Sequence, residues 1–229
     1  MQVQLLYHTP DPQRAIATAA RLCYAPVGAA ELMQDMSEKQ VYSVLDTIIK
    51  SGHHSTLEHA SYTFAVDGVS RALTHQLVRH RIASFNQQSQ RYVAFTNGID
   101  IVAPNTIQDN QEAKKIFDSA IDNITDAYSK LLDLGIPAED ARYILPNAAD
   151  SKIVITMNVR ELLHYFSLRC CRRAQWEIRD MSDKMLELVI PTAPFIFIDA
   201  GAPCKRGTCP EGKMSCKQPF ERINREKVL

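Results

Sequence analysis

The sequence predicts a mixed α+β fold, a single domain in which helices flank a central twisted sheet. Short segments rich in β-branched and aromatic residues, such as 3–7 and 60–66, predict strands. Longer segments with apolar residues at helical spacing, such as 38–50, predict helices. These segments do not alternate regularly along the chain, so we expect an α+β arrangement and not a series of strand–helix–strand units.

The predicted elements follow one another without an internal repeat or a low-complexity linker. We expect strands over residues 3–7, 60–66 and 152–157, and helices over residues 12–23, 38–50, 109–134, 138–144, 159–172 and 174–189. Ser70 is a suitable N-cap for a further helix that carries Leu73 and Leu77. We expect this helix to continue through residues 79–81 and to end near Ser84.

The composition fits a protein with a buried core and no broad charged surface. The chain has 229 residues, 45% of them hydrophobic, and its 26 basic residues balance 26 acidic ones. This balance argues against a nucleic-acid partner. We see neither a signal peptide nor an apolar run of the roughly 20 residues that span a bilayer, so we expect a cytoplasmic protein with no membrane partner. We place the main domain at residues 1–200 and a cysteine-containing tail at residues 201–229.

The segment 79–91 concentrates polar groups that are unsuited to a core. It contains three arginines, one histidine, two serines, one asparagine and three glutamines. Guanidinium groups suit phosphate, and the neutral side chains can hydrogen-bond to the edge of a base or of a flavin ring. A solvated surface loop is the alternative. Three arginines without interleaved carboxylates repel one another, so we favour a bound anion.

A second polar cluster, residues 52–59, contains three histidines and one glutamate. These are zinc ligands, but their spacing differs from the His-Glu-x-x-His arrangement of zinc peptidases. We therefore favour hydrogen bonds to a ligand over a metal site, with exposed loop histidines as the alternative.

A third cluster lies on the predicted helix that begins at residue 159. Arg160 and His164 are four residues apart and share a helix face. Arg169 is nine residues from Arg160, so at about 100° per residue it lies on roughly the opposite side. This arrangement favours a helix between two bound molecules, or a site shared among subunits. Ordinary surface charges beside core residues are the alternative.

One motif in these clusters is specific: Arg79-His80-Arg81, seven intervening residues and then Ser89. It resembles the signature of flavin-dependent thymidylate synthases. Further matches to the family are Ser84, Asn86, Arg91, His53, Arg142 and residues 55–59, 158–169 and 174–178. The resemblance covers about residues 1–198 and leaves the tail outside.

The resemblance implies a methyltransferase of dTMP biosynthesis that converts dUMP to dTMP. The implied carbon donor is the folate 5,10-methylenetetrahydrofolate, which leaves as tetrahydrofolate. The implied cofactor is FAD, and FADH2, regenerated with NADPH, is the hydride source. The resemblance also implies a homotetramer whose active sites are shared between subunits, with residues 1–200 as the catalytic domain.

The resemblance further implies two sets of site residues. The implied flavin contacts are His53, Ser55, Glu58, Arg79, His80, Arg81, Asn86, Gln87, Asn158, Val159, Arg160 and His164. The implied dUMP contacts are Gln76, Leu77, Val78, Arg79, Gln87, Gln88, Ser89, Gln90, Arg91, Arg142 and Arg169. Some family members have a glutamate in place of Gln87 and an asparagine in place of His164.

Arg169 is the implied catalytic residue. A fixed guanidinium near the pyrimidine stabilises the ring that has lost its N3 proton, and this makes C5 more nucleophilic. Cys170 and Cys171 adjoin Arg169, but a helical neighbour points about 100° away, so we expect no cysteine nucleophile. Ser89 has no evident base in the sequence, so we interpret it as a substrate ligand.

The tail contains Cys204, Cys209 and Cys216 in a turn-rich segment. Three thiols need one further ligand for a tetrahedral zinc site, so a structural metal or a redox-sensitive clasp is one hypothesis. A flexible tail with free thiols is the other. For the whole chain, a nucleic-acid-binding module and a zinc hydrolase are the competing functions, and a flavin absorption spectrum or a metal analysis separates them from the flavin enzyme.

Overall fold

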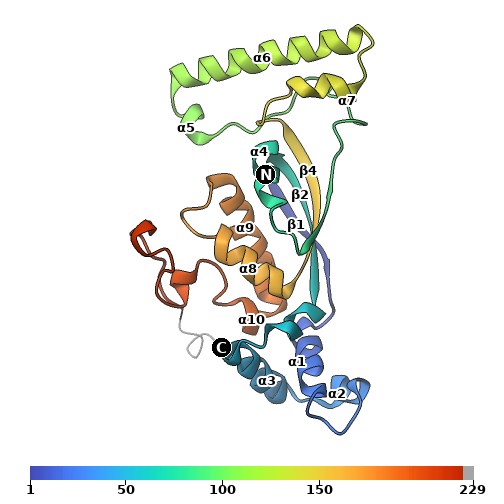
Figure 1. Ribbon diagram of the computed structural model, residues 1–229, viewed down its shortest axis with the longest axis vertical. Coiled ribbons are helices and arrows are strands. Elements are labelled where there is room, and N and C mark those ends of the chain that lie inside the picture. Colours follow the sequence, from blue (N-terminus) through green and yellow to red (C-terminus); the bar gives the residue numbers. More distant parts are fainter. Residues whose placement is uncertain (224–229) are drawn as a thin grey trace. The chain divides into compact units, whose positions relative to one another are not determined.

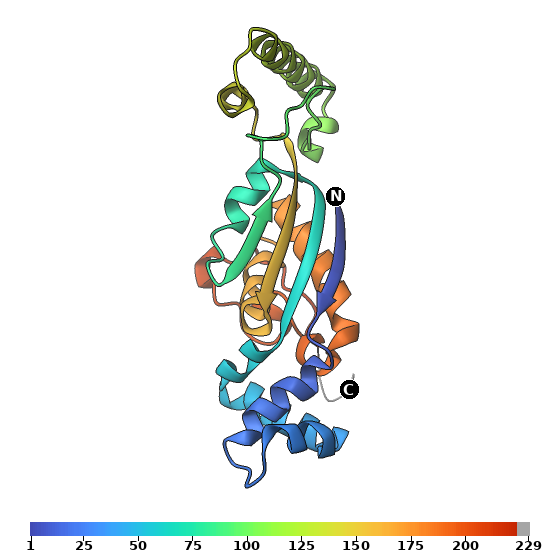
Figure 2. The ribbon, with the colours of Figure 1, turned by 90° about the vertical axis from the view of Figure 1, so that its right-hand side faces the viewer.

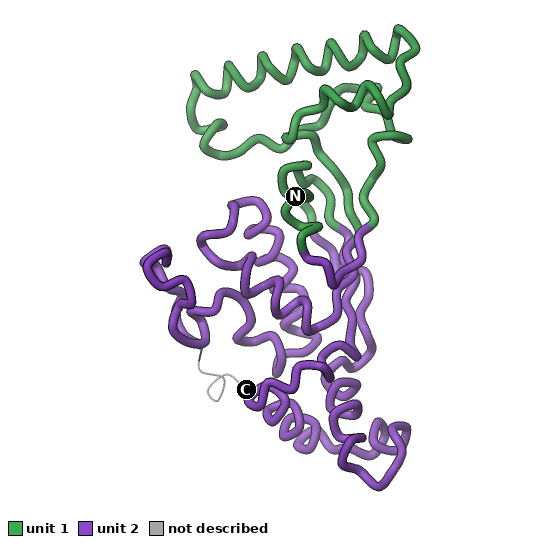
Figure 3. The backbone as a smooth tube through the Cα atoms, in the orientation of Figure 1, with its two compact units in different colours: residues 1–2, 66–79, 86–154 green, residues 3–65, 80–85, 155–229 purple. Residues whose placement is uncertain are grey.

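The computed structural model describes residues 1–223. The chain divides into two compact units (Figure 3). Unit 1 comprises residues 1–2, 66–79 and 86–154, and unit 2 comprises residues 3–65, 80–85 and 155–229. The predicted tail therefore belongs to unit 2. The limits predicted for the catalytic domain, residues 1–200, stay a prediction.

The predicted α+β class is confirmed: the strands form one four-stranded antiparallel sheet, in the order β1-β2-β4-β3 (Figure 2). Backbone hydrogen bonds from Thr9 to Ser61 and from Val159 to Ala60 join β1 to β2 and β2 to β4 at their ends. Strands β2 and β4 each contribute residues to both units. The strands are β1 (Gln2–His8), β2 (Ser61–Ser70), β3 (Ala83–Gln87) and β4 (Asp150–Asn158).

Most of the described residues belong to α-helices or 3-10 helices (Figure 1). The α-helices are α1 (Pro12–Leu22), α2 (Ala29–Asp35), α3 (Glu38–Ser51), α4 (Arg71–Leu77), α5 (Asn105–Gln108), α6 (Gln111–Asp133), α7 (Ala138–Ala141), α8 (Val159–Arg169), α9 (Trp176–Val189) and α10 (Pro194–Phe197). The 3-10 helices are η1 (His54–His59), η2 (Arg142–Ile144), η3 (Ile190–Thr192), η4 (Pro203–Lys205) and η5 (Gly212–Met214). The predicted helices over residues 12–23, 38–50, 109–134 and 174–189 are confirmed within two residues at each end, whereas α2, η1 and α10 were not predicted.

Local sequence signals set several helix ends, and the cap predicted at Ser70 is confirmed. Ser70 caps α4, because its hydroxyl accepts the Leu73 N–H at 3.1 Å. Ser37 begins α3 with a capping box that is closed by Gln40. Gly52 ends α3 with φ 73°, a left-handed conformation that a side chain disfavours.

The prediction that α4 continues to residue 84 is wrong. The helix ends at Leu77, and residues 83–87 form strand β3. Long-range pairing decides this, since the Gln88 N–H bonds to the Lys152 carbonyl at 2.8 Å next to the ladder with β4. The helix predicted over residues 159–172 is also shorter, because α8 ends at Arg169.

Unit 2 has an aromatic core. Tyr62, Phe166 and Phe197 are fully buried, and the ring of Phe197 meets the other two edge-on, at centroid distances of 5.6 and 6.2 Å. The Tyr62 hydroxyl shares a 2.8 Å hydrogen bond with Thr192. Burial raises the pKa of Tyr62 to about 12. Helix α8 packs against α9 and η1 in this unit and is thereby held in place.

Unit 1 has its own apolar cluster beneath α6. Tyr128, Ile99 and Ala141 are buried there, with Leu131 and Leu145 packed against them. The exposed face of α6 carries ion pairs at helical spacing, such as Lys130–Asp126 at 2.5 Å. The helix positions α7, which supplies residues to the site described below.

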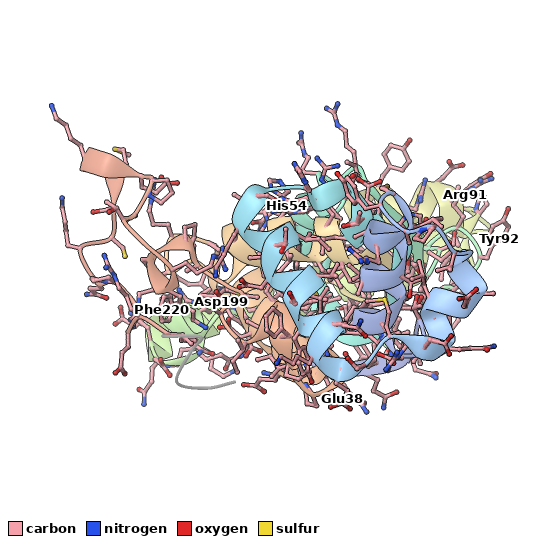
Figure 4. All side chains as sticks on the ribbon, turned by 90° about the horizontal axis from the view of Figure 1, so that it is seen from below. Glu38, His54, Arg91, Tyr92, Asp199 and Phe220 are labelled. Atoms are coloured by element: carbon pink, nitrogen blue, oxygen red, sulfur yellow. The ribbon has the colours of Figure 1, made fainter. Side chains whose placement is uncertain are left out.

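The described part of the tail, residues 201–223, is attached to unit 2 by specific contacts. The Arg172 guanidinium lies 4.6 Å from the ring centroid of Phe220, and Arg173 forms an ion pair with Glu211. Phe220 lies on this part of the chain, and Asp199 lies just before it (Figure 4). These contacts join the described part of the tail to the residues that follow α8.

Candidate functional site

A buried chain of two hydrogen bonds in unit 2 joins Glu161, His80 and Arg169. The His80 Nδ1 lies 2.9 Å from the Glu161 carboxylate, and the Arg169 Nε donates to the His80 Nε2 at 3.0 Å. The side chains of His80 and Glu161 are 3% and 7% exposed. Because the Arg169 Nε–H can only donate, Nε2 must be the unprotonated nitrogen, and the proton of the neutral ring is on Nδ1.

The surroundings of His80 favour its neutral form. Burial lowers the pKa of His80, and the positive charge of Arg169 lowers it further, whereas the hydrogen bond to Glu161 acts in the opposite direction. The net pKa lies below the ordinary value of histidine. A neutral His80 keeps its acceptor nitrogen for Arg169 at neutral pH.

Helix α8 supplies two members of this chain from one face. Glu161, Tyr165 and Arg169 follow one another at intervals of four residues, so they share that face. The Tyr165 ring meets His80 edge-on at a centroid distance of 4.9 Å. Asn158 caps α8 by accepting the Glu161 N–H at 2.9 Å, which fixes the first turn. These contacts hold the chain of hydrogen bonds in one geometry.

Arg169 also lines a pocket of about 770 Å³ in unit 2. The end of α8 and the tail form its walls, and the tail contributes Cys204, Cys209, Cys216 and Phe220. The pocket therefore unites the predicted catalytic residue with the segment that the resemblance left out.

The face of α8 opposite Arg169 presents Arg160, a residue predicted for the flavin. Arg160 forms a 2.5 Å ion pair with Glu58 of η1, and both side chains are about half exposed. His164 is exposed between the two faces, and its ring meets that of His80 edge-on at a centroid distance of 6.0 Å. Arg160 and Arg169 therefore have different partners, as their spacing predicts. The Val159 side chain is fully buried, so any contact of this residue with a cofactor must use its backbone.

The histidine-rich segment opens onto a second pocket of unit 2. His53 and Ser55 line a pocket of about 360 Å³ with residues of α1 and α3, including Arg21 and Val44, and with Tyr24, which follows α1. His54 begins η1 just after the end of α3 (Figure 4). The predicted flavin residues His53 and Ser55 thus share one hollow surface.

The last two residues of strand β3 belong to unit 1, and the alternation of the strand places their side chains in different environments. Gln87 is half-buried, whereas Asn86 is exposed. The Gln87 side-chain nitrogen donates to Ser151 at 2.7 Å and to Thr74 at 3.3 Å. These bonds use both amide hydrogens, so Gln87 offers a ligand its carbonyl oxygen.

An arginine cluster gathers around α7 in unit 1. Arg91 reaches the Glu139 carboxylate at 2.8 Å, and the Arg142 Nε donates to the Glu139 backbone carbonyl at 3.1 Å. Arg71, at the start of α4, has a lowered pKa because of its burial and of the nearby positive charge of Arg142. Two arginines predicted for dUMP and a third that was not predicted therefore form a positive region, in which Glu139 offers its carboxylate to Arg91 and its backbone carbonyl to Arg142.

Residues between β3 and this cluster also have polar groups suited to a ligand. The side-chain nitrogen of Gln90 is buried and has no hydrogen-bond partner among residues 1–223, and such an unpaired donor costs free energy. The Ser89 hydroxyl accepts the Arg91 N–H at 3.2 Å in a turn, which agrees with a structural or ligand role. Leu77 is fully buried, whereas Val78 is about half exposed.

Neither the metal site considered at residues 52–59 nor the one considered at the tail cysteines is supported. Within residues 1–223, no three His, Cys, Asp or Glu side chains are grouped as a metal ion requires. This holds for the histidine-rich segment and for the tail cysteines. All six thiols are free, and the Cys204 sulfur accepts the Phe220 N–H at 3.4 Å.

Two residues at these sites, Glu161 and Arg71, were absent from the predicted set. The spacing of Glu161 from Arg169, eight residues on a helix, is a signal that could have identified it. Arg71 follows an N-cap and reads as an ordinary first-turn residue. The remaining predicted residues are exposed or half-buried in their own units: Gln76, Arg79, Arg81 and Gln88.

Comparisons with known proteins agree with the resemblance. The profile of the thymidylate synthase complementing protein family matches residues 4–195. The flavin-dependent thymidylate synthase of Geobacter sulfurreducens is 55% identical over 222 residues, which cover 96% of both chains. The Clostridium tetani enzyme of the same name is 46% identical over 96% of this chain and 95% of its own.

A solved structure extends the likeness to the fold. A UMP/dUMP methylase, PolB from Streptomyces cacaoi, bound with 5-Br dUMP, superimposes with a TM-score of 0.76. It is 25% identical and covers 86% of this chain and 93% of its own. The chain belongs to the family of flavin-dependent thymidylate synthases, as the signature predicts.

The relatives correct one expectation about the tail. A match over 96% of this chain leaves out fewer residues than the tail contains, so it includes part of the tail. The view that residues beyond 198 lie outside the resemblance is therefore wrong for these relatives.

Proposed function

We propose that this protein converts dUMP to dTMP by reductive methylation, with 5,10-methylenetetrahydrofolate as carbon donor, FAD as cofactor and NADPH as reductant. The enzyme class, a flavin-dependent methyltransferase of dTMP biosynthesis, follows from the family. The observation that carries the proposal is the fixed guanidinium of Arg169, which His80 holds at 3.0 Å and which lines a pocket of about 770 Å³.

Arg169 is proposed to activate the pyrimidine. A guanidinium held beside N3 and its flanking carbonyls stabilises the N3-ionised ring more than the neutral ring. The ionised ring is more electron-rich at C5, where the new carbon is attached. Because the hydrogen bond to His80 fixes the guanidinium beforehand, little reorganisation opposes this effect.

The arginine cluster of unit 1 is proposed to bind the phosphate of dUMP. Arg91 and Arg142 meet at Glu139, and planar guanidinium groups bind phosphate oxygens in pairs. The unpaired buried nitrogen of Gln90 supplies a neutral donor for the same ligand. The dUMP of the solved relative, present there as its 5-bromo analogue, supports a nucleotide as occupant.

The donor chemistry of the remaining predicted residues fits a flavin dinucleotide. Arg79, Arg81 and Arg160 offer permanent positive charge for a pyrophosphate, and His53 and Ser55 line a pocket that can accept part of the cofactor. Bound flavin supplies the redox chemistry that no side chain provides. The role of the chain is to bind and orient it.

We also propose that the active sites are shared within a homotetramer. The support is the different partners of Arg160 and Arg169 on the two faces of α8.

Within residues 1–223 no helix is long and apolar enough to cross a membrane. A cytoplasmic location stays a prediction from the sequence.

The test is dTMP formation by purified protein with dUMP, methylenetetrahydrofolate, FAD and NADPH. We expect dTMP only when the folate is present, and a flavin absorption spectrum in the isolated protein. A protein that binds flavin but forms no dTMP with any reductant, including dithionite, contradicts the proposal. As a control for folding, the variant Lys184→Ala removes an exposed ion pair of α9 and should retain full activity.

A further inference from the structure

We propose that Glu161 and His80 are positioning residues for Arg169. They form a relay, Glu161–His80–Arg169, that fixes the plane of the guanidinium and its approach to the pyrimidine. The inference rests on the proposed role of Arg169 in binding dUMP. It gives the histidine of the Arg79-His80-Arg81 motif a role other than a flavin contact through its ring.

The geometry leaves the His80 ring no nitrogen for a cofactor. Nδ1 is 2.9 Å from Glu161, and Nε2 is 3.0 Å from the Arg169 Nε. His80 is only 4% exposed, and Tyr165 packs edge-on against it. In this arrangement Glu161 sets the tautomer of His80. His80 then orients Arg169, the residue proposed to act on the ligand.

The neutral imidazole transmits to Arg169 the orientation that Glu161 sets, and it keeps that carboxylate one residue away from the guanidinium. Arg169 is thus held at its Nε edge.

The same geometry makes the relay sensitive to acid. The charged or titratable groups around the ring are Glu161, His164 and Tyr165 of α8 and Arg169 at the end of that helix. Protonation of His80 removes the only acceptor nitrogen and places a second positive charge beside Arg169. The hydrogen bond is then lost, and turnover should fall on the acid side.

Two variants of His80 separate positioning from folding. In His80→Gln the amide oxygen occupies the place of Nε2 and can still accept from Arg169. In His80→Asn the shorter amide occupies the place of Nδ1 and keeps only the partner Glu161. Both remove one buried contact, so they should lose similar stability, but only His80→Asn should remove the acceptor at position 80 for the Arg169 Nε–H.

We expect His80→Asn to lower kcat by about 10- to 100-fold, the range found when a group that orients an active residue is lost. KM for dUMP should change by much less. His80→Gln should retain most of kcat. Thr63→Val is the matched control, because it removes a buried hydrogen bond, the one of 2.9 Å to Thr156, that involves neither the relay nor Tyr165, and it should keep kcat.

Equal losses of kcat in the two His80 variants, or none in either, overturn the positioning role. A second measurement does not need activity: ¹⁵N NMR of the histidine side chains of the flavin-bound tetramer, with His80→Gln used for assignment. We expect a neutral His80 protonated on Nδ1, and a shift to a mobile, mixed tautomer in Glu161→Gln. A ring protonated on Nε2 overturns the relay whether or not the variants fold.

The NMR result also separates two kinds of failure. If wild-type protein forms no dTMP, the proposed function fails, but the tautomer still reports on the relay. If wild-type protein forms dTMP and His80 carries its proton on Nε2, the function stands and the relay fails.

Discussion

The relay of unit 2 and the arginine cluster of unit 1 place arginines in opposite environments. In the relay, Arg169 is held by a histidine that is 3% exposed, itself held by a glutamate that is 7% exposed. In the arginine cluster, Arg91 and Glu139 are 50% and 47% exposed. Buried partners fix one geometry and are costly to lose, whereas exposed partners contribute little to stability and are screened by salt. We therefore expect the relay to orient Arg169, and the arginine cluster to attract the negatively charged phosphate.

The largest expected effect comes from removing the anchored guanidinium. Arg169→Ala should lower kcat by about a hundredfold or more, since a lost electrostatic contact in a preorganised site has that magnitude. Flavin binding should stay near normal. Arg169→Lys keeps the charge but not the planar fork, so it should rescue only part of the loss. The measurements are a titration of FAD and dTMP formation at saturating dUMP, and turnover near that of the wild type would refute the catalytic role.

The second expected effect is the recovery of activity when subunits of two inactive variants are mixed. Arg79→Ala and Arg169→Ala are each expected to be inactive alone. If one site uses these residues from different chains, subunit exchange creates some complete sites, and mixed tetramers regain activity. No recovery despite exchange shown by native mass spectrometry argues against sharing.

The pH dependence of stability provides a third test, specific to the relay. Because the pKa of His80 is lowered in the folded protein, the unfolded chain takes up a proton first as the pH falls below about 6.5. Stability should therefore fall from there towards lower pH. The carboxyls of Asp150 and Asp183 have raised pKa values from burial and act with the opposite sign. The difference between wild type and His80→Gln in urea unfolding at pH 7 and pH 5 isolates the histidine.

A smaller effect is expected in the arginine cluster. Arg142→Ala should raise KM for dUMP by about tenfold, in line with one lost charged hydrogen bond, and leave kcat nearly unchanged. The increase in KM should shrink at high salt, because the attraction is screened. Lys130→Ala, an exposed cation of the same unit, is the control. A loss confined to kcat would mean that the cluster orients the reacting ring.

The smallest effect should follow from Glu139→Gln. The carboxylate pairs with Arg91 in an exposed setting, so the free energy of unfolding should change by less than about 1 kcal/mol. Removing the negative charge beside Arg91 should lower KM for dUMP slightly. A large loss of stability would show that the cluster is as rigid as the relay.

The local features of the fold could be predicted because adjacent residues decide them. Ser70 caps α4, and Gly135, with φ 80°, follows α6 where the apolar periodicity ends. The family could be predicted for the same reason, since the Arg79-His80-Arg81 motif and Ser89 are spaced along a single segment. The family then implied Arg169 as the catalytic residue.

Partners far apart in the chain were decided by the tertiary structure alone. Strand β3 exists because residues 83–87 pair with β4, although the preceding periodicity favours helix. His80 and Glu161 are 81 positions apart, and Arg91 and Glu139 are 48 apart. By itself, the sequence determined which side chains carry the charges and hydrogen-bonding groups that the proposed nucleotide site requires. Only folding decided which of them are buried and oriented, because hydrogen bonds between distant residues require the packed core that brings them together.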